Sequence, residues 1–259
     1  MLRRALACAA SLPACAGGPA PAVATGLALS PASQEPAEAE GRPWMHGFAP
    51  ATGAGSGKAL TLRHESTTVD IDDKDAFVAS VDGDVDFDLT GIQYAFAAGA
   101  NMFRLTVATV GCANDAIAGD SDAGAFGGVA VAFPIARMGR FVWAGDAGFH
   151  GGAVDWRQPA YDETSVGWFQ YDLRAGLAYA PSPTSLAAVS PRAALGVRMI
   201  DGIQDLGAGD TTDFDAVAPY ALFGVGGHVR TGARSRLGVD LHGMVGDLQG
   251  FEFAISFQF

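Results

Sequence analysis

The sequence predicts an all-β fold: a closed antiparallel up-and-down transmembrane β-barrel of about ten strands, with eight as the alternative. Three observations predict it. The chain ends on a strongly alternating stretch, Gln249 to Phe259, and similar stretches separated by turn residues recur from residue 59 onward. Charged side chains gather on one face of these stretches, and the other face is nearly free of charge. A period of two is that of a β-strand, and a closed barrel lets lipid cover the apolar face while every backbone group is paired.

The terminal stretch places large apolar residues at every second position: Phe251, Phe253, Ile255, Phe257 and Phe259. In a soluble sheet this face needs a second layer, and an edge strand of a soluble sandwich is the competing interpretation. A terminal amphipathic strand that ends on Phe resembles the C-terminal assembly signal of bacterial outer-membrane β-barrels. The resemblance implies that the barrel assembly machinery of the outer membrane is a partner and reads this strand.

The strands are predicted in order from the same alternation. They cover residues 59–71 (weakly), 87–96, 103–107, 129–133, 141–150, 169–179, 192–199, 217–230, 236–245 and 251–259. In the second of these the phase slips at Gly91, which predicts a β-bulge. Short turns are expected at 99–101, 134–139, 231–233 and 246–247, and Pro181 to Pro183 ends the sixth strand.

Longer polar loops are predicted at 112–124, 155–164 and 205–214, together with an acidic loop that runs from about Asp70 to Asp88. Long loops on one side and short turns on the other are typical of outer-membrane barrels, with the short turns in the periplasm. Both ends of the chain would then lie on the periplasmic side, which favours an even number of strands.

The charged face predicts the lumen, because Arg or Lys on the lipid face costs about 2–4 kcal/mol at the membrane midplane. The residues on this face are Arg104, Asp146, His150, Asp172, Arg174, Arg192, Arg198, His228, Arg230, Arg236, Asp240, His242 and Glu252. A barrel of eight to ten strands has a narrow lumen filled by side chains. We therefore interpret these residues as a salt-bridged core, with a narrow water-filled pore as the alternative.

The N-terminus predicts export. Met1 to Arg4 is a charged start, the run to Leu12 is apolar, and small residues suited to cleavage follow, so residues 1–24 are interpreted as a signal peptide. Leu12 to Cys15 resembles a lipobox, which leaves lipidation of Cys15 as an alternative. Residues 25–58 are rich in Ala, Pro, Ser and Glu and predict a flexible periplasmic lead.

The composition argues against several classes of protein. The hydrophobic fraction is 49%, but after the export segment no run of 18 apolar residues lacks charges, which argues against a helical membrane protein. The net charge of −12 argues against nucleic-acid binding. With Cys8 and Cys15 in the export segment, Cys112 is left as a single thiol and is expected to be a packed residue.

Motifs that suggest catalysis are weak. Residues 53–58 (GAGSGK) lack the spacing of a P-loop, and His150-Gly151-Gly152 has no accompanying nucleophile elbow. Asp240 with His242, and Asp84 with Asp86, match acidic and Asp-His pairs of barrel proteases only through very common patterns. The acidic loop lacks the spacing of an EF-hand, so no metal and no cofactor is expected.

Residues 59–259 as a whole resemble the small outer-membrane β-barrel family of the OmpA-like transmembrane type, without a peptidoglycan-binding domain. The resemblance implies a monomer in the outer membrane of a Gram-negative-type bacterium, in contact with lipid and lipopolysaccharide. The family does not imply a single activity. The first hypothesis is a structural or surface-interaction role without enzymatic activity, the second a narrow pore for ions or small solutes, and the third a barrel-embedded hydrolase.

Overall fold

The computed structural model describes residues 57–73, 83–114, 119–158, 161–182, 185–207, 210–233 and 235–259. The predicted signal peptide 1–24, the lead up to Ser56 and Cys15 lie outside the described residues. Within the described part of the chain no helix is long and apolar enough to cross a membrane.

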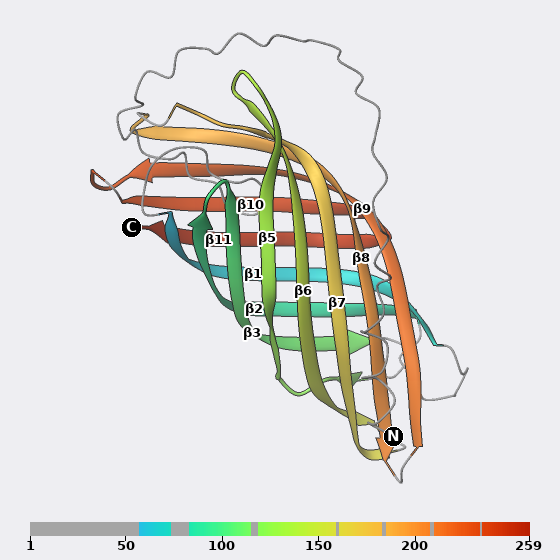
Figure 1. Cartoon of the computed structure of the whole chain (residues 1–259). Helices are drawn as coiled ribbons and strands as arrows, with labels where there is room; N and C mark the ends of the chain where they lie inside the picture. Colours follow the sequence, from blue (N-terminus) through green and yellow to red (C-terminus); the bar gives the residue numbers. More distant parts are fainter. Residues whose placement is uncertain are drawn as a thin grey trace, which may run out of the picture. The chain divides into compact units, whose positions relative to one another are not determined.

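Ten long strands form a closed ring, as predicted. They are β1 (Lys58–Asp73), β2 (Gly83–Ala98), β3 (Asn101–Asn114), β5 (Gly124–Met138), β6 (Phe141–Gln158), β7 (Tyr161–Tyr179), β8 (Ala187–Gly207), β9 (Asp210–Arg230), β10 (Arg236–Gly246) and β11 (Leu248–Gln258). Each strand pairs antiparallel with its neighbours in this order, and β11 pairs with β1 along Ala59–Val69. The two-residue β4 (Gly119–Asp120) pairs with β3. Figure 1 shows the two walls with their strands crossing at a steep angle, as tilted strands do in a barrel.

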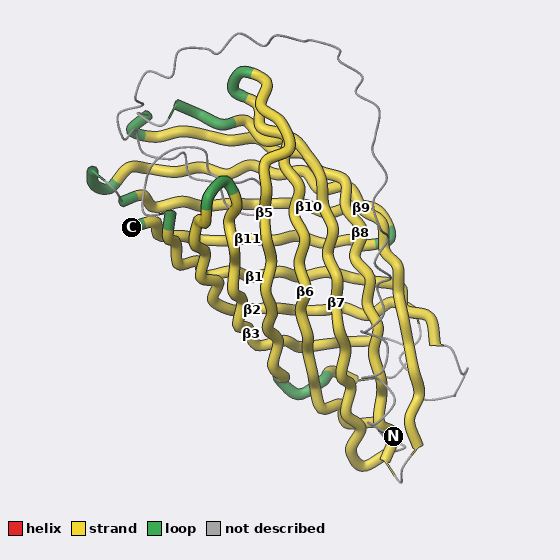
Figure 2. Tube along the Cα trace, viewed as in Figure 1, coloured by secondary structure: helices red, strands yellow, loops and turns green. Residues whose placement is uncertain are grey.

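The two ends of the barrel differ. At one end, called here the terminal end, the amide of Phe259 donates to the carbonyl of Lys58 (3.2 Å). The turns Gly99-Ala100 and Gly139-Arg140 lie at this end and are short, as Figure 2 shows. The opposite, distal end carries the tips of the β6–β7 and β8–β9 hairpins. The β10–β11 hairpin stops short of those tips, at Gly246-Asp247, and beyond it β9 pairs directly with β1 at Asp72↔Asp215.

The outer surface carries an apolar belt, defined by exposed residues that alternate with the buried ones along the strands. Its members are Leu60, Leu62, Ile92, Phe103, Leu105, Val107, Val129, Phe133, Phe141, Trp143, Phe149, Phe169, Tyr171, Leu173, Leu195, Val217, Phe223, Val225, Val229, Leu237, Val239, Leu241, Val245, Phe251, Phe253, Ile255, Phe257 and Phe259. On β7 apolar outward positions extend from Phe169 to Tyr179, with Leu177 and Tyr179 half-buried, close to the roughly 9–11 residues that a tilted strand needs to cross a bilayer.

The distribution of apolar and polar side chains between the two faces inverts toward the distal end, while the alternation of inward and outward positions continues. On β2, Ile92 is 53% exposed on the outside, whereas Phe87 and Leu89 are only 6% exposed and point inward. Asp84, Asp86 and Asp88 take the outward positions there. The same inversion occurs on β9, where Val217 is exposed and Phe214 is buried. The distal part of the barrel is therefore apolar inside and acidic outside, like a water-soluble β-barrel.

This inversion explains two errors in the predictions. The bulge predicted at Gly91 is wrong, because the pairing of β2 with β1 and β3 is unbroken there. The two apolar sets of β2 simply face opposite sides of one regular strand. Irregularities occur instead at Pro134/Ala136, Trp156/Gln158 and Asp205/Gly207.

The loops predicted at 155–164 and 205–214 are also wrong. Strands β6 and β7 continue through the first range and β8 and β9 through the second, with only residues 159–160 and 208–209 between them outside the described part. The predicted loop 112–124 is shorter, since β3 runs to Asn114, and the acidic stretch lies mostly in β1 and β2. The outward Asp residues of these segments have a loop-like composition, but the inward Trp156, Val166 and Phe214 continue the core.

Candidate functional site: the lumen

The distal half of the lumen is filled by an apolar core. Its largest fully buried side chains are Trp156 and Phe214, and the ring of Trp168 packs at 5.4 Å on that of Phe87. The remaining members are mainly Val, Ile, Leu and Ala side chains from all ten long strands, such as Val69, Val110 and Leu222. Cys112 is buried in this core as a free thiol. The lumen is thus closed at this level by hydrophobic packing.

A network of ion pairs lies on the terminal side of this core. Asp146 on β6 contributes a fully buried carboxylate that is bound by two arginines from other strands. Arg104 on β3 donates to its Oδ2, and Arg174 on β7 donates from Nη2 to its Oδ1 at 3.1 Å. Because β5 lies between β3 and β6, the Arg104 side chain reaches across a neighbouring strand to make this pair.

A second group of ion pairs crosses the lumen. Arg198 on β8 donates from Nε to Asp172 on the adjacent strand β7 (2.9 Å). Its Nη2 also lies 2.8 Å from Oε1 of Glu65 on β1. Where Glu65 lies, the strands β9 to β11 stand between β8 and β1, since β1 pairs directly with β9 only at Asp72 and Asp73. This pair therefore joins distant parts of the wall through the interior.

A third group connects β1 with β8, β10 and β11. Arg63 pairs with Glu65 on its own strand and, at 3.3 Å, with Glu252 on β11. Glu252 in turn lies 3.9 Å from Nδ1 of His242. Arg192 on β8 donates to Asp240 and approaches Nε2 of His242 at 3.4 Å. His150 completes the network 3.8 Å from Asp172.

The network is balanced in charge. The interior ion pairs of the described residues join five arginines (Arg63, Arg104, Arg174, Arg192 and Arg198) to five carboxylates (Glu65, Asp146, Asp172, Asp240 and Glu252). Breaking one of these buried ion pairs is costly, because removing one partner leaves an uncompensated charge in a low-dielectric interior. Such a balanced set is suited to crosslinking the wall from inside.

Glycines make room for these side chains. Gly224 on β9 stands directly opposite His242, and Gly226 stands opposite Asp240. A Cβ at Gly224 would overlap the imidazole of His242 and would lie 2.6 Å from the carbonyl oxygen of Leu241. The absence of a side chain at this position allows the imidazole to lie flat against the wall.

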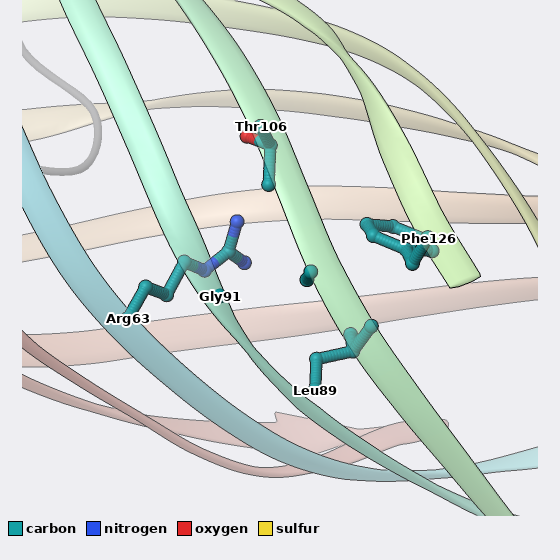
Figure 3. A pocket seen from close by; sticks show the side chains of 6 residues that line it. Arg63, Leu89, Gly91, Thr106 and Phe126 are labelled. Atoms are coloured by element: carbon teal, nitrogen blue, oxygen red, sulfur yellow. The ribbon is translucent and has the colours of Figure 1, made fainter. Parts of the chain in front are cut away.

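The described residues of the lumen enclose a small pocket. This pocket, shown in Figure 3, lies between the network and the apolar core and is lined by Arg63, Leu89, Gly91, Thr106, Ala108 and Phe126. Its free volume is about that of a single water molecule. The Arg63 side chain points into it from β1 (Figure 3).

The structure places the predicted lumen residues on the inner face. Of the thirteen, Arg174 and Arg230 are half-buried and the other eleven are buried. Ten of them take part in the network or lie against it, whereas His228, Arg230 and Arg236 lie apart, at the terminal end. The residues of the predicted assembly signal are exposed on the outer face: Phe251, Phe253, Ile255, Phe257 and Phe259.

Sequence reasoning missed Arg63 and Glu65, which contribute three of the network's ion pairs. Their alternation with Leu62 and His64 was the available signal, but the apolar Val69 and Ile71 follow on the same face and obscure it. It also missed the apolar distal core. The possible catalytic pairs are not brought together as such: Asp240 binds Arg192, and Asp86 lies outside and accepts a hydrogen bond from Thr68.

No family model matches the chain, and no curated protein matches it. Among solved structures 29 chains match. One is described as "TodX monoaromatic hydrocarbon channel deltaS2 mutant", with 9% sequence identity over 79% of this chain and 90% of that chain, at a TM-score of 0.30. A likeness of this degree carries no functional argument. The closed ten-stranded ring and its apolar belt fit the class of bacterial outer-membrane β-barrels.

Proposed function

We propose that this protein is an outer-membrane β-barrel of the small, OmpA-like kind, with a structural or surface-interaction role, and that its lumen does not conduct solutes. The observation that carries the proposal is the filling of the lumen. An apolar core occupies the distal half, and the Arg198–Glu65 pair crosses the interior below it. The small pocket between them, lined by Arg63 and Phe126, has room for about one water molecule.

The position in a membrane is supported by the apolar belt. A closed ring leaves no open edge, so every strand can lie in lipid with its backbone groups paired. Aromatic side chains gather near the terminal margin of the belt, where Phe96 stacks on Phe103 and Phe141 contacts Tyr179. Aromatic girdles of this kind mark the membrane–water interfaces of outer-membrane barrels. In this arrangement the terminal end faces the periplasm, and the acidic distal part stands in water outside.

A non-enzymatic role is supported by the surroundings of the best catalytic candidates. His242 and Asp240 lie in the buried network, below the apolar core, with Glu252 and Arg192 as their neighbours. The apolar core of the described residues lies between them and the distal end. The acidic outer surface of the distal part is the surface available for interaction, and the C-terminal strand as an assembly signal stays a prediction.

Conductance tests the proposal. Protein that shows heat-dependent mobility in SDS, and is therefore folded, would be reconstituted in planar bilayers. We expect no step conductance above that of protein-free bilayers. Both the apolar core and the ion-pair network would block the passage of ions through the lumen. Reproducible single-channel steps from the folded protein would favour the narrow pore instead.

The membrane boundary is testable with two substitutions on the outer face of β7. Leu173→Arg places a charge within the belt and is expected to lower the free energy of unfolding in lipid vesicles by about 2–4 kcal/mol. Ser165→Arg lies on the same face but in the distal part, where outward residues are polar, and should change it by less than about 0.5 kcal/mol. Denaturant titration in vesicles measures both. Equal losses would mean that the belt ends elsewhere on β7.

A further inference from the structure

The ring of strands is closed in a different way in the belt and in the distal part. In the belt, the β10–β11 hairpin stands between β9 and β1. Its strands have 11 residues each, whereas β8 and β9 have 21 each. The hairpin turns at Gly246-Asp247, and distal to this turn β1 pairs directly with β9 at Asp72↔Asp215. The distal part is therefore closed by the β1–β9 pair, without the hairpin.

The tip of the hairpin fits closely between β1 and β9 at the point where these strands separate. The amide of Asp247 donates to the carbonyl of Pro219 on β9 (3.0 Å). On the other side, Gly250 has a φ of +143°, and a Cβ at this position would overlap the carbonyl oxygen of Ser66 on β1. The side chain of Leu248, between these two contacts, is fully buried in the apolar distal core. Both flanking strands therefore hold the tip.

On the terminal side of the tip, the hairpin contributes two of the five carboxylates of the ion-pair network. Asp240 binds Arg192 on β8, and Glu252 pairs with Arg63 on β1 at 3.3 Å. The five arginines of the network lie on other strands, namely β1, β3, β7 and β8. The inner face of the hairpin therefore presents carboxylates to arginines on both sides of it. This attraction between opposite charges favours insertion of the hairpin into the wall.

We propose that the β10–β11 hairpin is the last element to enter the barrel during folding, after β1 and β9 have closed the distal part. Asp72 and Asp215 are 143 positions apart, and joining such distant segments has a large cost in chain entropy. Once they are joined, the hairpin needs only a local movement, because five residues connect β9 to β10. The hairpin is thus the part of the wall that can enter or leave while the distal ring stays closed. This order of folding does not depend on the proposed non-conducting role.

The order is tested by the rates of folding into lipid vesicles and of unfolding from them, measured by tryptophan fluorescence. Leu248→Ala removes a buried side chain from the hairpin, and Phe214→Ala removes one from β9 where it pairs with β1. We expect Leu248→Ala to unfold about thirtyfold faster or more and to fold at a rate within about threefold of the wild type. Phe214→Ala should instead fold about tenfold more slowly or more, because its contacts form with the β1–β9 closure.

A second pair of variants tests the fit of the tip. Gly250→Ala places a methyl group against the Ser66 carbonyl at a positive φ, whereas a Cβ at Gly243, on the outer face of β10, meets nothing within 4 Å. Gly250→Ala is expected to unfold about fivefold faster or more, since the hairpin no longer seats fully. The control Gly243→Ala should change the unfolding rate by less than about threefold. Neither change should slow folding.

The comparison of folding rates decides the proposal. Slower folding of Phe214→Ala than of Leu248→Ala would support late entry of the hairpin. Equal slowing by the two changes, or slower folding of Leu248→Ala or Gly250→Ala, would overturn it. If Phe214→Ala fails to fold, as judged by heat-dependent mobility in SDS, Ile71→Val on β1 provides the same comparison, since Ile71 is fully buried beside the β1–β9 pair. Conductance is not part of this experiment, so a failure here is separate from a failure of the non-conducting role.

Discussion

Replacing Asp146 with Asn is expected to lower the free energy of unfolding by about 3–5 kcal/mol, the cost of removing one partner of a buried ion pair. The Asp146 carboxylate has no exposed surface and is bound by Arg104 and Arg174. An amide of the same size keeps the packing but leaves both guanidiniums facing a neutral group. The measurement is equilibrium unfolding in lipid vesicles, followed by tryptophan fluorescence and by gel mobility without heating.

The control for this substitution lies on the same strand. Asp155→Asn makes the same chemical change on β6, but the Asp155 side chain is exposed on the outside. Its effect should stay within about 0.5 kcal/mol. Adding Arg104→Met to Asp146→Asn should recover part of the loss, since it removes one of the two uncompensated charges. Equal effects of Asp146→Asn and Asp155→Asn would show that the network does not hold the barrel together.

Much of the membrane-facing part of the barrel was predictable from the sequence, because its rule is simple. In the belt, apolar side chains face out and polar side chains face in, with a period of two. Phe169 to Tyr179 and Phe251 to Phe259 follow this rule without interruption, and both strands form as predicted. The count of ten strands follows from the same alternation together with short turns at positions such as Gly246-Asp247.

The distal part was predicted poorly, because there the alternation is reversed: apolar side chains face in and polar side chains face out. Outside the belt the solvent is water, so Phe87 and Leu89 turn inward and Asp84 and Asp86 turn outward. A reader who applies one rule to the whole strand finds a phase slip at Gly91 and interprets it as a bulge. Along β2 the inversion marks the change of solvent, and the backbone stays regular.

The partners within the lumen were beyond sequence reasoning for a different reason. Alternation gives the face on which a residue lies, but not the height at which it meets a residue from another strand. Arg198 and Glu65 are 133 positions apart, and their contact depends on the tilt of all the strands between them.

Replacing Phe214 with Ala is the second substitution with a large expected effect, about 3–5 kcal/mol in the free energy of unfolding. The Phe214 side chain is 2% exposed in the apolar distal core, and its ring covers Gly202 on β8. Removing the ring leaves a cavity that neither lipid nor neighbouring side chains can fill. The lost burial of the ring and the cavity therefore both lower the free energy of unfolding. Denaturant titration in vesicles measures the loss.

The informative comparison is Phe223→Ala, the same change on the same strand but on the outer face, where Phe223 is 59% exposed in the belt. Lipid can occupy the space that the ring leaves, so no cavity forms. The loss in the free energy of unfolding then comes only from the transfer of the ring from water to lipid, and we expect about 1–2 kcal/mol. A larger loss for Phe214→Ala than for Phe223→Ala would place the tightly packed core inside the distal barrel. Equal losses, or a greater loss at Phe223, would contradict an inverted distal zone and reopen the question of a water-filled lumen.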